Sequence, residues 1–180
     1  MYRLFRIICC SIMLLVVLQT NVLASDTITE NGFRNLYWGE SIEDIRQSYE
    51  VTYSKYYMSE NAVTYTFSME PADINGVQST PFATINLWND QLYKITIMFN
   101  ADTLEQSKHN YDLMVAKISE TLPLYKQGTT NDSEAAVWIM MNGTAVMLGH
   151  FKELKDGKYV NVLVMDNTFI ENQAKKRKSE

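Results

Sequence analysis

Apolar and polar residues alternate with a period of two through the middle of the chain. Three stretches show it: NAVTYTFSME (61–70), FATINLW (82–88) and LYKITIMF (92–99). In each stretch most of the apolar residues share one side, and Asn89-Asp90 between the last two suits a tight hairpin turn. This alternation is typical of an antiparallel sheet with one packed face and one face in water. The preceding stretch VTYSKYY (51–57) predicts a less regular strand.

Two segments have helical periodicity instead. Asp102 to Leu122 carries one apolar stripe, Asp102 and Glu105 have capping-box spacing, and Pro123 ends the pattern. A shorter helix follows the strand predicted at 33–37, with Ser41 as its N-cap and two acidic residues in its first turn. The helices expected are therefore one long amphipathic helix and one short N-terminal helix.

The last third of the chain predicts strands with a different pattern. VWIMM (137–141) and TAVMLGHF (144–151) flank Asn142-Gly143, a strong hairpin signal, and DGKYVNVLVM (156–165) supplies a last strand. The stretch 126–135 between helix and strands is polar and is expected to be a loop.

These late strands carry apolar residues on both sides. Trp138 and Met140 alternate with Val137, Ile139 and Met141, which predicts that both faces are covered. We expect the long helix to take one face. The other face could be covered by the short helix or the C-terminal tail, or by a partner, and a homodimer through the late strands stays open.

Together these patterns predict a single α+β domain over residues 25–170. Its mainly antiparallel sheet has about seven strands, with the long amphipathic helix and the short N-terminal helix packed on it. Residues 171–180 end in KKRKSE and are expected to form a basic, disordered tail.

Residues 1–24 have the pattern of a secretory signal peptide. Arg3 and Arg6 precede an apolar run of about 12 residues, and Val22-Leu23-Ala24 offers a cleavage site. The run is well short of the roughly 20 residues that a membrane-spanning helix needs. We therefore expect an exported protein, periplasmic or secreted, with no transmembrane segment after signal removal.

Loss of this segment changes the composition. Both cysteines, Cys9 and Cys10, leave with it, so the mature chain has no disulfide and no thiolate. Without Arg3 and Arg6, 14 basic residues face 21 acidic ones, and residues 25–174 alone carry 10 against 20. An acidic body argues against nucleic acid as a partner, because phosphate binding needs basic surface.

The sequence carries no recognisable catalytic, cofactor or metal motif. Two separated histidines without cysteine make a poor zinc set. His109 falls on the polar side of the long helix, and His150 lies in a strand, where a hydrogen-bonded structural role is the simplest interpretation. We assign no catalytic residue, no metal and no cofactor.

The stretch FRNLYWGESIEDIRQ (33–47) resembles the start of a broad class of small exported bacterial α+β proteins, many of unknown function. More distantly it is similar to the helix start of the BamE/SmpA-like and beta-lactamase-inhibitor-like domains, through Gly39, Ser41, Asp44 and Ile45. The lipobox cysteine of BamE-type lipoproteins is missing. The resemblance implies a two-layer domain that binds protein, in envelope assembly or in enzyme inhibition, and implies no catalytic residues.

The leading hypothesis is an exported, non-enzymatic protein-binding module, with an inhibitor or immunity-type role as one form of it. The partner would be another protein, and the acidic body suits a basic one. Exposed aromatic residues would carry the contact. The candidates are Tyr53, Tyr56, Tyr57 and Trp88, with Trp138 added if the late strands are not fully covered. Two alternatives are a binder of a small apolar ligand and a hydrolase using His150.

Overall fold

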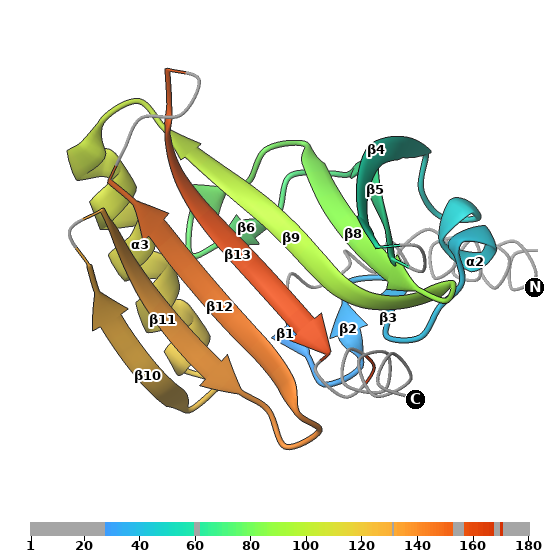
Figure 1. The fold of residues 1–180 in the computed structure, drawn as a ribbon. Helices are drawn as coiled ribbons and strands as arrows, with labels where there is room; N and C mark the ends of the chain where they lie inside the picture. The colour runs from blue at the N-terminus through green and yellow to red at the C-terminus, as the bar shows by residue number, and fades with distance from the viewer. Residues whose placement is uncertain (1–27, 60–61, 131, 153–156, 168–169, 171–180) are drawn as a thin grey trace, which may run out of the picture.

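An eight-stranded antiparallel sheet forms one layer of the molecule, in the order β10-β11-β12-β13-β9-β8-β5-β4 (Figure 1). The computed structural model describes residues 28–59, 62–130, 132–152, 157–167 and 170, and only the backbone of 53–59. The strands of the sheet are β4 (Val51–Ser59), β5 (Ala62–Ser68), β8 (Phe82–Trp88), β9 (Gln91–Ala101), β10 (Leu124–Thr129), β11 (Ser133–Ile139), β12 (Thr144–Phe151) and β13 (Tyr159–Asn167).

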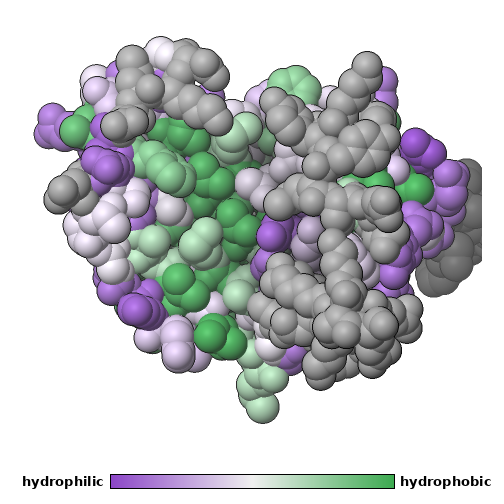
Figure 2. All heavy atoms as spheres, viewed as in Figure 1, coloured by the Kyte–Doolittle hydropathy of each residue, from purple (hydrophilic) through white to green (hydrophobic). Residues whose placement is uncertain are grey.

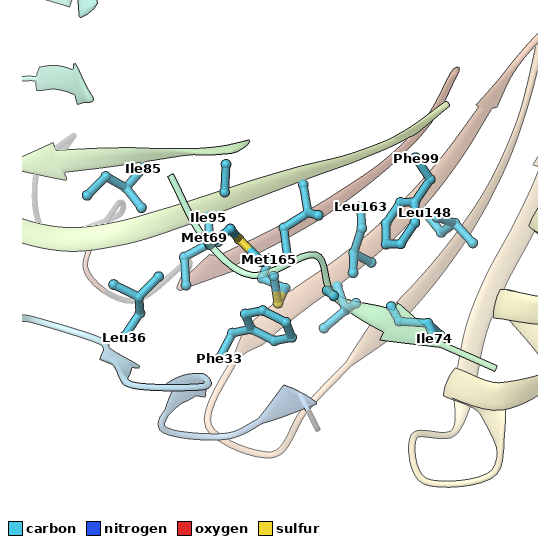
Figure 3. Packing of buried hydrophobic residues seen from close by; sticks show 14 of the residues in the cluster. Phe33, Leu36, Met69, Ile74, Ile85, Ile95, Phe99, Leu148, Leu163 and Met165 are labelled. Atoms are coloured by element: carbon cyan, nitrogen blue, oxygen red, sulfur yellow. The ribbon is translucent and has the colours of Figure 1, made fainter. Parts of the chain in front are cut away.

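The second layer lies on one face of this sheet. Helix α3 (Leu104–Ser119) packs against β12, β13 and β9. Beside it lie two smaller sheets, formed by β1 (Ile28–Thr29), β2 (Gly32–Phe33) and β3 (Leu36–Tyr37), and by β6 (Asp73–Ile74) and β7 (Val77–Gln78). Figure 3 shows Phe33, Leu36 and Ile74 pointing from these smaller sheets toward side chains of the large one. The predicted α+β class, with one long and one short helix, is confirmed.

The short helix α2 (Ile42–Arg46) begins as its sequence predicts. Gly39 turns the chain with φ 87°, and the Ser41 side chain accepts a hydrogen bond from the Asp44 backbone N–H. The Asp44 carboxylate accepts one from the Ser41 N–H in return, which completes a capping box. The preceding run 33–37 is not one strand, however. Arg34 has φ 54°, so the chain folds into the hairpin β2–β3.

Helix α3 starts one residue later than the sequence predicts. Thr103, not Asp102, is the N-cap, and its hydroxyl accepts from the Gln106 N–H while the Gln106 side chain accepts from the Asp102 N–H. Lys108 ties the helix to β11 through Glu134 at 3.4 Å. Partial burial lowers the pKa of Lys108, but the Asp112 and Glu134 carboxylates outweigh it and raise this pKa above its ordinary value.

The middle strands follow the predicted alternation. Ile85 on β8 faces Ile95 on β9, both fully buried, and the hairpin between the strands has positive φ at Asn89 and Asp90, as a type I′ turn requires. A second hairpin of this kind, β6–β7, turns at Asn75-Gly76, with φ 57° and 82°. The Asn-Gly dipeptide in DINGVQ signals that turn, and its two-residue strands are too short to show alternation.

The predicted loop at 126–135 is wrong, because most of it is strand. β10 pairs with β11, and it is the eighth strand of the sheet. All six residues of β10 are exposed, which explains why its sequence shows no apolar alternation. The predicted hairpin at Asn142-Gly143 is present. Gly143 has φ 84° and donates its N–H to the Met140 carbonyl at 3.0 Å, so the turn residues are 141–143 rather than two residues alone.

Candidate functional site

The late strands present two different faces, and the inner one belongs to the core. The face under α3 carries Trp138, Val146, Leu148 and Leu163, each fully buried. The Trp138 Nε1–H donates to the Ser119 hydroxyl at 3.1 Å, which joins β11 to the end of α3. The Trp138 candidacy as a contact residue is therefore wrong, because this side chain has no surface left for a partner.

The opposite face of the same strands is apolar and open to solvent. Ile139, Met147 and Phe151 expose 43%, 41% and 44% of their surface. Other apolar residues between them are half-buried. Figure 2 shows this face of the sheet, with hydrophobic residues gathered over the late strands. We call this surface the apolar patch; its residues are Met98, Ala135, Val137, Ile139, Ala145, Met147, Phe151, Val162 and Val164.

The patch has a relief of large and small side chains along β12. Ala145, Met147, Gly149 and Phe151 occupy its successive outward positions. A Cβ placed on Gly149 would lie 3.4 Å from the Phe151 ring, so this ring covers the glycine on the outer side. Met147 therefore stands between a small residue and a glycine covered by a flat ring.

The outer face changes character from β13 to β9, where Met98 is the one residue of the patch. One row of cross-strand neighbours runs through Val137, Met147 and Val164. On the edge strand β10 this row ends at Lys126. In the other direction it continues from β9 to β4 with threonine only, and we call this part the threonine row: Thr96, Thr84, Thr66 and Thr52. One half of the outer face is therefore mainly apolar, and the middle row of the other half carries hydroxyl groups, with the exposed Phe82 on the same side of β8.

Few charged residues lie on the described part of this outer face. On the edge strand β10, Lys126 pairs with the outward Val137 and its side chain is exposed. Among the outward positions that the structure describes on β5, β8, β9, β11, β12 and β13, only Lys94 and Asp166 are charged. Their side chains form an ion pair at 3.0 Å. The acidity of the chain therefore lies elsewhere, and the patch offers no unpaired carboxylate to a basic partner.

Both edges of the sheet carry irregularities that discourage pairing with another strand. The register of β10 shifts between Leu124 and Lys126, and β4 shifts twice, between Ser54 and Tyr57 and between Tyr57 and Ser59. Bulges and lysines on edge strands hinder edge-to-edge association. A contact through the sheet is therefore better served by its face than by its edges.

The structure does not gather the aromatic candidates into one site. Tyr53, Tyr56 and Tyr57 lie on the edge strand β4, and their side chains lie outside the described residues. Trp88 is half-buried at the end of β8, opposite Ala62 and Gln91. The apolar patch instead consists mainly of aliphatic residues and methionine. The sequence signal for this patch is that the late strands carry apolar residues on both sides.

The expected cover of the outer face by the short helix is wrong. The Ile42 N–H at the start of α2 donates a hydrogen bond to Asp90 Oδ1 in the β8–β9 turn at 3.0 Å, and the Ile42 and Ile45 side chains join the core. Figure 1 places α2 at the far end of the sheet from β11 and β12. The C-terminal tail, 171–180, lies outside the described residues, as does the expected signal peptide.

His150 belongs to a buried cluster between α3 and the sheet. The Asn161 side-chain amide donates to the Ser107 carbonyl at 2.9 Å, which leaves Asn161 Oδ1 as an acceptor for His150 Nδ1 at 3.0 Å. His150 Nδ1 therefore carries a hydrogen, and it also lies 3.2 Å from the Ser107 hydroxyl. A catalytic base must instead accept the proton of its nucleophile. With Ser107 and His150 at 0% and 1% exposure, this cluster fastens α3 to β12 and β13.

Other kinds of site have little support. Within the described part of the chain, no group of three or more histidine, aspartate or glutamate residues is placed to hold a metal ion. No helix among those described is long and apolar enough to cross a membrane.

A hollow open to solvent lies beside Phe82, lined by Ser68, Met69, Glu70, Pro71 and Pro81. His109 on α3 is exposed, as its position in the sequence predicts.

Comparison of the chain with models of known protein families, with curated proteins and with solved structures gives no match.

Proposed function

We propose that this chain is an exported, non-enzymatic protein-binding module, and that the apolar patch is its contact surface. The observation that carries the proposal is the exposure of Ile139, Met147 and Phe151 side by side on one face of the sheet. Contiguous exposed apolar surface of this kind marks interaction sites in soluble proteins. Methionine adds adaptability, because its unbranched side chain fits irregular partner surfaces.

Export to the periplasm or the exterior is the second part of the proposal. It rests on the signal-peptide pattern of residues 1–24 and on the absence of cysteine from the rest of the chain. The resemblance of residues 33–47 to exported α+β proteins supports the same role, in envelope assembly or as an inhibitor. The capping box at Ser41 and Asp44 explains that motif as the start of a helix. The apolar patch is therefore the stronger support for protein binding.

The two alternative functions have weaker support. A hydrolase using His150 would need access to a ring that is 1% exposed and that already donates from Nδ1. A binder of a small apolar ligand would need space between α3 and the sheet. Tyr111 and Met114 on α3 and Trp138 on β11 are fully buried there and belong to the same hydrophobic core. No feature of the described residues specifically favours either of these two functions.

An affinity experiment tests the proposal. The tagged chain from Ser25 to Glu180 is incubated with envelope extract of its source, alongside the variants Met147→Glu and Thr66→Glu, and bound proteins are identified by mass spectrometry. We expect one stoichiometric protein that Met147→Glu loses and Thr66→Glu keeps, and that binds again when purified. If all three chains retain the same proteins, or none, the patch is not the contact surface for a partner from the envelope.

A further inference from the structure

We infer that the occupant of the apolar patch is a second copy of this chain, packed face to face through β11, β12 and β13. The inference rests on the proposed function and names its partner. Three properties of the patch support it: its charge, its relief and its size.

The charge of the patch favours its own copy over a basic protein. In a twofold dimer the same surface lies on both sides of the contact, so a patch with several unpaired charges of one sign would face charges of that sign. Lys94 and Asp166 are the only charged outward residues described on β5, β8, β9, β11, β12 and β13, and they pair with each other. Lys126 on the edge strand β10 adds one positive charge at the rim of the patch, beside Val137. A basic partner would instead be selected by carboxylates around the contact, and the outward positions described on these strands present none that is unpaired.

The relief of β12 is self-complementary. Its outward residues alternate between small and large, and a twofold axis beside Leu148 would run two copies of β12 antiparallel. Met147 of each copy then meets the Phe151 ring that covers Gly149 of the other. Methionine sulfur makes favourable contacts with aromatic rings. Two sheets packed in this way, with inner faces interdigitated, form the usual core of a β-sandwich.

The size of the patch sets the strength of the dimer. Four strands about 4.8 Å apart and about seven residues of roughly 3.4 Å each give a face of roughly 450 Å². Standard interfaces bury about 800 Å² per partner, and weak ones less than about 600 Å². We therefore expect a reversible dimer with a dissociation constant in roughly the micromolar range.

Salt separates this dimer from a complex with a basic protein. Residues 25–174 carry 10 basic and 20 acidic residues, so two copies repel each other at a distance. Raising the ionic strength from about 0.1 M to about 1 M shortens the Debye length from about 10 Å to about 3 Å. Association of two copies should therefore strengthen with salt, whereas binding of a basic protein should weaken.

Sedimentation velocity of the chain from Ser25 to Glu180, between about 1 and 500 µM and at both ionic strengths, tests the inference. We expect a monomer–dimer equilibrium that tightens with salt. Met147→Glu should weaken it at least tenfold, while Thr66→Glu, on the same row of the same face, should leave it within about twofold. Met147→Thr repeats the test without a new charge, and thermal unfolding checks that each variant is folded.

A chain that stays monomeric at 500 µM overturns the inference, and so does a dimer that survives both changes at Met147 or that salt dissociates. The proposed function fails separately. A monomeric chain whose purified envelope partner is lost only in Met147→Glu would keep the patch as a binding surface and replace the second copy with that partner. A monomer without any Met147-dependent partner would overturn both.

Discussion

The outer face of the large sheet has two halves that share one backbone geometry and differ in their side chains. On the row through the middle of the sheet, Val137, Met147 and Val164 give way to threonine from β9 onward. Both Val and Thr are β-branched and favour strands, so strand formation does not explain the change. Threonine keeps a hydroxyl in water, whereas the apolar half leaves hydrocarbon exposed, and that difference is the reason why we propose only the apolar half as a contact surface.

The inner and outer sides of β11 give the largest expected contrast. Trp138 is fully buried beneath α3, so Trp138→Ala should lower the free energy of unfolding by about 3–5 kcal/mol through lost contacts and the cavity left behind. Its outward neighbour Ile139 is 43% exposed, and Ile139→Ala should cost less than about 1 kcal/mol. Urea unfolding measured below the concentration of any dimer checks both. Equal losses of unfolding free energy in the two variants would contradict the placement of Trp138 in the core and of Ile139 at the surface.

The buried polar cluster should give the next largest effect. Asn161→Ala removes the partner of the Ser107 carbonyl and of His150 Nδ1. Leaving such groups buried without a hydrogen bond should cost about 1–3 kcal/mol in the free energy of unfolding. Asn100→Ala, at an exposed position of β9, is the matched control and should change stability by less than about 0.5 kcal/mol. A stable Asn161→Ala protein would mean that the cluster does not fasten α3.

Extending the threonine row across the patch should separate stability from association. In the triple variant Val137→Thr, Met147→Thr and Val164→Thr, the apolar half becomes like the polar half. Since these side chains are partly exposed already, we expect a loss of less than about 2 kcal/mol in the unfolding free energy of the monomer. We expect association to disappear in sedimentation velocity. A triple variant that unfolds would show that the patch belongs to the core of the monomer.

A pH dependence should be the smallest effect. Burial raises the pKa of Tyr111, with Glu134 and Asp112 adding to it and Gln127 and Lys108 opposing it, and burial likewise raises that of Tyr49. As the pH rises, the unfolded chain therefore loses the hydroxyl protons of these two tyrosines at a lower pH than the folded chain does. The stability contributed by neutral tyrosine is complete below about pH 10 and is lost as the pH rises above it. Unfolding between pH 9 and 11 should show a shallower loss in Tyr111→Phe than in wild type; an unchanged slope would contradict the assignment.

Much of the fold could be predicted from the sequence, because local signals and packing agree in the middle strands and at the helix starts. Ile85 and Ile95 lie as their alternation predicts, and Ser41 caps its helix. β10 could not be predicted in this way. All its residues are exposed, so its backbone hydrogen bonds to β11 define it as a strand, and no apolar period marks it.

The candidate site was predictable only in part. Two-sided apolar strands indicated a second surface needing cover, and α3 covers only the inner one. The sequence could not decide which of Trp138 and Ile139 faces the helix, since both are apolar and alternate with each other. Aromatic residues are the contact candidates that a sequence suggests, because each offers a large contact area. The patch consists mainly of smaller residues whose common outward direction appears only when four strands pair in register.

The most direct test of the account follows Met147 itself. In methyl-labelled protein, the methionine methyl signals are recorded by NMR with a soluble paramagnetic agent, between about 10 and 500 µM chain. We predict that the Met147 methyl group becomes protected from the agent as the concentration rises, while the buried Met114 stays protected throughout. A Met147 methyl group that remains equally accessible at every concentration would contradict the pairing of two copies through the apolar patch.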